Sequence, residues 1–233
     1  MHESQKQYST FVKAQEDGTE SQQTYQQIAK QSYDYLMKAV SLFESVEDSV
    51  NLIVCNLNLG RFFRFSAHIN ILRDHDAVHS LRTQKEFYNK SFKNYNRALS
   101  ILESRKKNAE LWDLINWELS TATFNLAKQM QDFGSVDGCT GELEQEVLDM
   151  LFKALKLCDL ETSSPRQVLY QFRGGLIYHR LASFYHQSLR SSEDKGKRRN
   201  LMMVCQLNYE KAANILESLR VRIRLFDVSM CCN

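Results

Sequence analysis

Small and apolar residues recur along this chain at steps of four and then three, with polar residues between them. That spacing places a small residue, a bulky residue and an alanine on one face of a helix, as a closely packed neighbouring helix requires. Four segments of closely similar sequence carry it. They are KAVSLFES, RALSILES, KALKLCDL and KAANILES, which begin at Lys38, Arg97, Lys153 and Lys211.

The alanines of these four segments lie at nearly equal intervals, which indicates a repeat. Ala39, Ala98, Ala154 and Ala212 are separated by 59, 56 and 58 residues. We therefore expect these alanines to occupy equivalent helix-contact positions. The expected packing faces are Ser32, Leu36 and Ala39; Ser91, Tyr95 and Ala98; Val147, Leu151 and Ala154; and Cys205, Tyr209 and Ala212.

Three segments of a second kind lie between these helices: LNLGRFF around Gly60, WELSTATF from Trp117 to Phe124, and YHRLASFY from Tyr178 to Tyr185. They resemble the first (A) helix of the tetratricopeptide repeat, whose pattern is W-x-x-L-G-x-x-Y. The four similar segments that begin at Lys38, Arg97, Lys153 and Lys211, which we call the repeated phrase, then correspond to the second (B) helix of the repeat. The predicted fold is all-α, a tetratricopeptide-like helical-repeat solenoid. The matching positions are Leu59, Gly60 and Phe63; Trp117 and Phe124; and Tyr178, Leu181, Ala182 and Tyr185.

The period exceeds the roughly 34 residues of a standard repeat of this type. Three polar segments account for the excess and predict long intra-repeat loops: RDHDAVHSLRT, DFGSVDGCTG and RSSEDKGKRRN. Ser164 and Pro165 form a start signal for a helix, a capping serine followed by a proline at the first helical position. The predicted helices are 20–46, 50–72, 83–105, 109–132, 142–160, 165–190 and 199–225.

The domain organisation follows from these helices. Residues 1–19 are expected to be a flexible or weakly helical segment, residues 20–226 the repeat domain, and residues 227–233 a C-terminal tail. The first predicted helix has B character without an A partner, and the last helix lacks a polar cap. Solenoids normally end in polar terminal repeats, so we expect a slice of a longer array.

Composition supports a helical, non-enzymatic protein. The chain has a single proline and eight glycines, too few for the turns of an all-β fold. Its six cysteines include no C-x-x-C pair, and no apolar run opens the sequence, so we expect reduced thiols in the cytosol or nucleus. No phosphate-binding loop or nucleophile motif is present, and we expect no catalytic residues and no cofactor. His75 and His79 have a zinc-compatible i, i+4 spacing but no third ligand, and we expect no metal.

Longer stretches of the sequence resemble one known family. They are LWDLINWELSTATFNLAKQMQDF, LEQEVLDMLFKALKLCDL and QFRGGLIYHRLASFYHQSLR. These segments, and NWELST and HRLASFYH in particular, resemble the helical-repeat region of the erythroid differentiation-related factor family. The resemblance implies a nuclear protein that controls erythroid gene expression through other transcription-regulatory proteins. The cytoplasm is the alternative location.

A solenoid of this type binds partners on a concave wall lined by its A helices. The tetratricopeptide register places six candidate residues on that wall, and it predicts that Trp117 is buried against the preceding helix pair. The clamp that holds a terminal carboxylate in tetratricopeptide co-chaperones is absent, because its lysine and asparagine positions hold Leu57 and Arg61. The candidate wall residues are Arg61, Arg64, Glu118, Asn125, His179 and His186.

Charge leaves one alternative open. From residue 166 onward the chain has 12 Lys and Arg against 5 Asp and Glu, a local net charge of 12 − 5 = +7, although the whole chain carries only +2. A basic segment of this kind suits an acidic partner or nucleic acid. The candidate basic loop in it comprises Lys195, Lys197, Arg198 and Arg199. Because the aromatic residues of this third occupy helix-packing positions, we expect direct nucleic-acid binding only as the alternative to a protein-binding scaffold. No segment is apolar enough to span a membrane.

Overall fold

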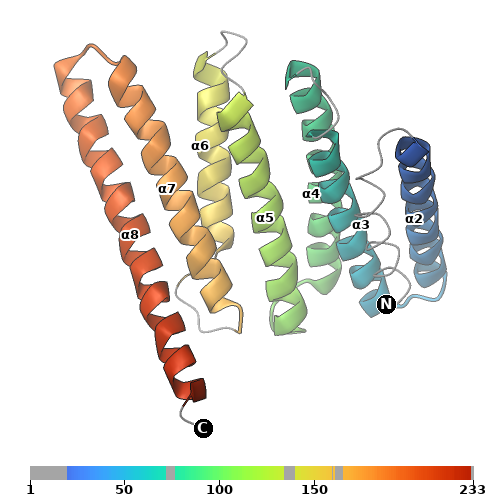
Figure 1. The fold of residues 1–233 in the computed structure, drawn as a ribbon. Coiled ribbons are helices and arrows are strands. Elements are labelled where there is room, and N and C mark those ends of the chain that lie inside the picture. Colours follow the sequence, from blue (N-terminus) through green and yellow to red (C-terminus); the bar gives the residue numbers. More distant parts are fainter. Residues whose placement is uncertain (1–19, 72–76, 134–139, 159, 161–164, 232–233) are drawn as a thin grey trace.

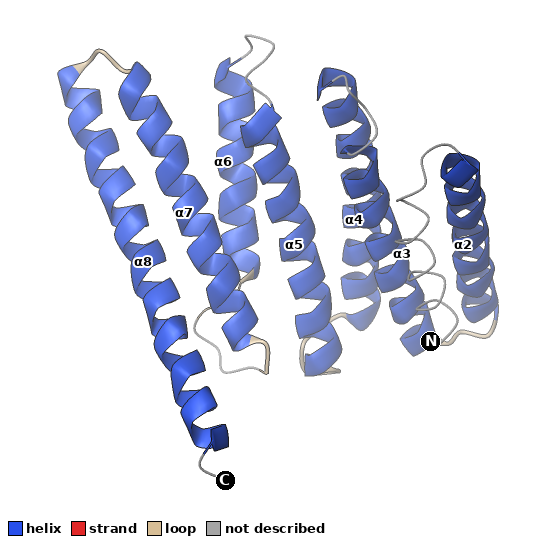
Figure 2. Ribbon diagram, viewed as in Figure 1, coloured by secondary structure: helices blue, strands red, loops and turns tan. Residues whose placement is uncertain are grey.

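The computed structural model describes residues 20–71, 77–133, 140–158, 160 and 165–231. Within them the chain forms seven α-helices and no strand (Figures 1 and 2). The all-α repeat architecture expected from the sequence is therefore confirmed. In chain order the helices are α2 (Glu20–Ser45), α3 (Ser49–Ile71), α4 (Ala77–Leu102), α5 (Ala109–Phe133), α6 (Thr140–Leu157), α7 (Gln167–Ser191) and α8 (Lys195–Cys231).

The helices form antiparallel pairs that stack in chain order. The pairs are α3 with α4, α5 with α6, and α7 with α8, and α2 packs on α3 at one end (Figure 1). We call α3, α5 and α7 the A helices and α2, α4, α6 and α8 the B helices. Each B helix also contacts the A helix that follows it, as α4 does with α5 and α6 with α7. The A helices thus form one layer and the B helices another.

The repeated segments supply a fully buried face in α4 and α6, whereas Tyr209 of the expected face in α8 is 36% exposed and Leu36 and Ala39 in α2 are half-buried. Ala98 and Ala154 are fully buried and Ala212 is 3% exposed, as the sequence predicted. Bulky residues one turn earlier on the same face, Tyr95 and Leu151, are also fully buried. The small side chain of each alanine lets the A helix approach closely, and the neighbouring bulky residue fills the space beside it.

Gly60 shows how closely the pairs pack. A Cβ atom at this position would lie 2.3 Å from the ring of Tyr95. One turn earlier in α4, the Ser91 hydroxyl donates a hydrogen bond of 2.7 Å to the Gly60 carbonyl. The third pair repeats this contact, since the Cys205 thiol lies 3.4 Å from the carbonyl oxygen of Ala182. Gly60 and Ala182 are therefore equivalent, as the tetratricopeptide pattern predicted.

The predicted register of α5 is wrong by about two turns. The Ser120 hydroxyl donates to the Ala154 carbonyl, at 3.1 Å. Because the two helices are antiparallel, a step of seven residues along α5 from Ser120 matches a step of seven backward along α6. Ala127, which is fully buried, therefore lies opposite Val147 and is the counterpart of Gly60.

Trp117 consequently has a different role from the one predicted. It is half-buried rather than buried, and it packs on the following A helix instead of on the preceding pair. Its ring meets that of Tyr170 edge to face, with 5.8 Å between the ring centroids. Trp117 fits the tetratricopeptide pattern by sequence. In the packing, however, Leu126 and Ala127 are the counterparts of Leu59 and Gly60.

The extra length of the repeat lies in the helices, so the expectation of long loops is also wrong. Five residues separate α3 from α4 and six separate α5 from α6. Only three residues separate α7 from α8. The last of them, Asp194, caps α8 by accepting a hydrogen bond from the Lys197 backbone N–H at 2.6 Å, so the helix begins directly after the turn. The basic residues from Lys195 to Arg199 are thus the first turns of a helix and not a loop.

Two further boundaries differ from the sequence analysis. Helix α7 begins at Gln167, with Pro165 and Arg166 in a turn, and the predicted cap Ser164 lies outside the described residues. Helix α8 continues to Cys231, through most of the segment assigned to a tail. The division of the chain into a first segment, a repeat domain and a tail stays a prediction. None of the helices in the described ranges is long and apolar enough to cross a membrane.

Most of the buried apolar residues fall into a large cluster and a small one. The large cluster extends from Ile53 in α3 through α4, α5 and α6 to Leu181 in α7. The small cluster joins α2 to α3 and consists of Val40, Cys55 and Leu59, with half-buried residues around it. Helix α2 is therefore attached by much less apolar packing than the helices that follow it.

Candidate functional site

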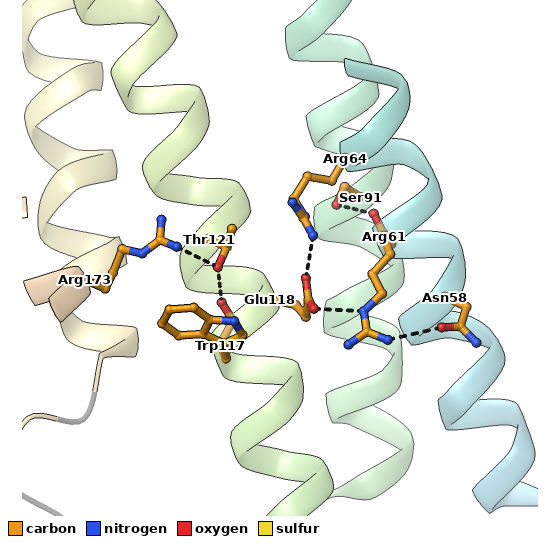
Figure 3. Close-up of polar contacts among 9 residues, drawn as sticks. Asn58, Arg61, Arg64, Ser91, Trp117, Glu118, Thr121 and Arg173 are labelled. Atoms are coloured by element: carbon orange, nitrogen blue, oxygen red, sulfur yellow. Dashed lines mark hydrogen bonds and ion pairs between the residues drawn. The ribbon is translucent and has the colours of Figure 1, made fainter. Parts of the chain in front are cut away.

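The A helices α3 and α5 are joined by a carboxylate held between two arginines. The Arg61 Nε donates to the Glu118 carboxylate at 2.9 Å, and a terminal nitrogen of Arg64 donates to its other oxygen, also at 2.9 Å (Figure 3). The Glu118 side chain is only 9% exposed, whereas that of Arg61 is 36% exposed. Because each oxygen has its own charged donor, the carboxylate is well compensated for its burial.

A third arginine reaches the same layer from α7. The Arg173 guanidinium lies 4.9 Å from the centroid of the Trp117 ring and 5.0 Å from that of Phe124. It also donates to the Thr121 hydroxyl at 3.3 Å (Figure 3). Burial lowers the pKa of Arg173, and the positive charge of Arg64 acts in the same direction. We call Arg61, Arg64 and Arg173, with Glu118, the arginine cluster.

The cluster has more positive than negative charge. Its three arginines and one glutamate give a net charge of 3 − 1 = +2. Burial acts to lower the pKa of Arg64, but Tyr95 and the Glu118 carboxylate outweigh it, so that the pKa is raised. Among the described residues, Arg173 donates to no carboxylate and instead contacts two aromatic rings and the Thr121 hydroxyl. An incoming carboxylate or phosphate would therefore be favoured most strongly beside Arg173.

The structure brings three of the predicted wall residues together and adds a fourth residue that the sequence analysis missed. Arg61, Arg64 and Glu118 were predicted to share the wall, and both arginines contact Glu118. Arg173 was not among the candidates, although it precedes Gly174, whose missing side chain lets Leu160 approach. An arginine seven residues before a second one, Arg180, was the available signal. Both point from α7 toward α5, since Arg180 forms an ion pair with Asp132.

The other three candidates lie elsewhere. Asn125 forms a side-chain hydrogen bond with Tyr88, which places it toward the B helix α4. His179 and His186 pack edge-on against the ring of Tyr209 in α8, with centroid distances of 5.9 and 6.4 Å. On α7 these histidines occupy a different face from Arg173. The six predicted wall residues therefore do not form one continuous site.

The basic residues at the start of α8 are largely exposed. Lys195, Lys197 and Arg199 face solvent. Arg198 donates to the carbonyl oxygens of Leu189 and Ser192, at 3.1 and 2.9 Å, and so helps to close the turn between α7 and α8. At least one of the four thus has a structural role.

The described residues contain no group of three side chains suited to hold a metal ion. His75 and the side chain of His79 lie outside what the structure describes, so the zinc spacing at these positions stays untested. The thiols of Cys158 and Cys205 are buried, and burial raises the pKa of each. Raised pKa values disfavour the thiolate that a nucleophile or metal ligand needs.

Comparison with known proteins gives consistent matches over nearly the whole chain. The family model described as "Erythroid differentiation-related factor 1-like, TPR repeats" matches residues 5–231. Erythroid differentiation-related factor 1 of Homo sapiens and that of Pongo abelii are each 35% identical over 198 residues, and that of Mus musculus is 33% identical. The alignments cover 84% of this chain and 16% of each relative. No solved structure matches.

Proposed function

The chain belongs to the family of erythroid differentiation-related factor 1-like tetratricopeptide-repeat proteins, and on that premise we propose that it is a non-enzymatic scaffold that binds protein partners through its A helices. We further propose that it acts in the nucleus, where its partners are transcription-regulatory proteins. The name of the relatives, erythroid differentiation-related factor 1, supports a role in erythroid differentiation. Since the chain spans about 16% of their length, the activity of a whole relative bears on it only as part of this proposal.

The arginine cluster is the observation that carries the proposal. Three arginines converge on the layer of A helices with one carboxylate between them. Arginine recognises carboxylates through paired hydrogen bonds and also stacks on aromatic rings. The partner segment is therefore an acidic one, whose carboxylate meets Arg61 and Arg173 while its apolar part covers Trp117.

The test reverses one exposed charge of the cluster. Arg61→Glu places a carboxylate beside Glu118 and should repel an acidic partner. Arg82→Glu is the matched control, because Arg82 is on α4, has a side chain that is 84% exposed, and lies outside the cluster. Both variants should keep the circular dichroism of the wild type. Quantitative affinity capture from nuclear extract should then show partners that are depleted about tenfold by Arg61→Glu and retained by Arg82→Glu. Equal capture by the two variants would overturn the proposal.

The second candidate function is nucleic-acid binding through the basic C-terminal third. The exposed side chains of Lys195, Lys197 and Arg199 within the first turns of α8 favour it. Binding of this kind weakens steeply as salt rises, because each phosphate contact releases counterions. Retention on duplex DNA across a salt series, with Lys197→Glu as the variant, separates the two functions. A steep salt dependence that the variant abolishes would favour nucleic acid over protein partners.

A further inference from the structure

A groove opens on the B-helix side of the molecule, between α2 and α4. It has a volume of about 680 Å³, and α3 forms its floor. The residues of α3 that face it, Leu59, Phe62 and Phe63, alternate along the helix with Arg61 and Arg64, which point toward α5. The periodicity of a helix places these two sets on opposite sides of α3. The groove is therefore a different surface from the arginine cluster.

Aromatic rings line the floor and one wall of this groove. The ring of Tyr33 in α2 lies 6.0 Å from that of Phe62 and 5.9 Å from that of Phe63, centroid to centroid. Phe62 and Phe63 also meet edge to face at 5.5 Å. These rings are half-buried, and Met37 in the same wall is 41% exposed. The groove thus offers apolar and aromatic surface that the chain itself covers only in part.

The rim of the groove carries only positive charge. Its described lining includes Lys30, Lys90, Lys93 and Arg97 and no aspartate or glutamate. Arg97 is neutralised by an ion pair with Glu44. Lys90 lies over the rings of Phe63 and Phe87, at 5.7 and 5.5 Å. That leaves a net charge of 4 − 1 = +3 around an apolar floor.

The repeat architecture does not fill this space. Because α2 is a B helix, the repeat would place an A helix before it, in the layer of α3, α5 and α7 and on the far side of α2 from the groove. The groove extends along α2 from Tyr25 to Val40, which is about 22 Å at 1.5 Å per residue. That length matches roughly four turns of an additional helix.

We propose that this groove binds an amphipathic helix of a protein partner, with acidic side chains on both flanks of an apolar stripe. The apolar stripe packs on Phe62, Phe63 and Met37, and the carboxylates meet Lys30 from one wall and Lys93 from the other. This is the helix-in-groove mode of recognition, with affinity from apolar burial and orientation from charge. The proposal extends the scaffold function to a second surface and does not depend on the arginine cluster.

Binding of two designed peptides to the full 233-residue chain tests the proposal. One is an amphipathic helix of about 15 residues with leucine and phenylalanine at i, i+3, i+4 and i+7 and glutamate on both flanks. The other replaces every glutamate with lysine. Fluorescence anisotropy should show the acidic peptide bound at least about tenfold more tightly than the basic one. No binding of the acidic peptide, or equal binding of both, overturns the proposal.

Variants of exposed groove residues locate the binding. Lys30→Glu and Lys93→Glu should each weaken the acidic peptide about five- to tenfold, and Lys106→Glu, in the exposed turn after α4, should leave it unchanged. Met37→Gln should weaken binding of the acidic peptide. The matched control is Met203→Gln, because Met203 is an exposed methionine on α8, away from the groove. Arg61→Glu should have no effect, which separates this result from the test of the arginine cluster. Equal loss with Lys106→Glu would show non-specific attraction and overturn the proposal.

Chemical acylation of lysines gives an independent readout. The acidic peptide should protect Lys30 and Lys93 from acylation and leave Lys106 reactive. Duplex DNA is the comparison ligand, because a cationic aromatic surface also suits nucleic acid. Protection of the two lysines by DNA and not by the peptide would overturn the proposal in favour of a nucleic-acid site.

Discussion

The repeated phrase is buried to different extents in two regions of the molecule. These regions are the junction of α2 with α3 and the central block from α3 to α7. In the central block, Tyr95, Ala98, Leu151 and Ala154 are fully buried, and the clusters of successive pairs merge into one core. At the first junction Val40 is buried, but Leu36 and Ala39 of the same phrase are only half-buried. The corresponding positions are therefore fully buried in α4 and α6 but only half-buried in α2.

Under the groove proposal, the central block supplies most of the stability and the first junction supplies a binding surface. A B helix in the central block is covered by its own A helix and by the next one, as α4 is by α3 and α5. Helix α2 packs on α3 and also reaches α4 through the ion pair between Glu44 and Arg97. Its remaining apolar surface lies beside the groove, where a partner can use it.

The largest effect should come from truncating the central core. Leu151→Ala removes a fully buried side chain and should lower the free energy of unfolding by about 2–5 kcal/mol. Val40→Ala, at the first junction, should cost only about 1–2 kcal/mol, at about 0.8 kcal/mol per buried methylene. Urea denaturation measures both. Equal losses would mean that α2 is as firmly packed as the central helices.

Alkaline pH should destabilise the central block through two buried tyrosines. Burial raises the pKa of Tyr88 and of Tyr95 to about 12, from an ordinary value of 10. Their contribution to stability is therefore fully present below about pH 10. It is lost as pH rises toward 12, because the unfolded chain releases these protons first. The loss is about 2–3 kcal/mol per tyrosine, at 1.36 kcal/mol for each unit.

Urea denaturation at intervals between pH 9 and 11.5 follows this loss, and Tyr95→Phe is the variant that isolates it, since it removes one hydroxyl and keeps the ring. Its unfolding free energy should fall less steeply over that range than that of the wild type. The same slope in both proteins would show that the loss arises from deprotonation of surface lysines instead.

Gly60→Ala probes the side of α3 that faces the central block. The added methyl group would meet the Tyr95 ring, and overpacking of this kind costs about 1–3 kcal/mol. Gly141→Ala is the control, because nothing lies within 4 Å of the new atom. That substitution should be neutral or stabilising by up to about 1 kcal/mol, since alanine favours the helix. Thermal denaturation of both variants gives the comparison, and a harmless Gly60→Ala would contradict the close approach of α3 and α4.

The smallest effect belongs to the ion pair that crosses the groove. Arg97 of α4 contacts Glu44 of α2, and their side chains are 49% and 43% exposed. Exposed pairs of this type contribute about 0.2–1 kcal/mol. A double-mutant cycle with Arg97→Ala and Glu44→Ala measures the coupling directly. A coupling well above that range would mean that charge, and not apolar packing, holds α2 in place.

The candidate site was only partly predictable, and the reason is visible in α5. The tetratricopeptide pattern assigned Arg61, Arg64 and Glu118 to one wall, and in the structure both arginines contact Glu118. The same pattern placed Trp117 opposite the wrong B-helix residues, since WELSTATF contains aromatic residues at the right spacing in the wrong turn. The pattern predicts Thr121 at the glycine position, and the structure has Ala127 there. A shift of six residues is about 1.7 turns of a helix, so it changes the face as well as the partners, and Asn125 lies toward α4 instead of on the wall.

The sequence by itself determined the all-α fold, the alternation of A and B helices, and the burial of Ala98, Ala154 and Ala212. Those properties depend on the helical periodicity of apolar residues, which residues close together in the sequence determine. The tertiary structure alone decided the axial register of α5 against α6, the approach of Arg173 to Trp117, and the distance of α2 from α4. Each of these depends on how far one helix slides along or separates from another, and many long-range contacts set that distance jointly.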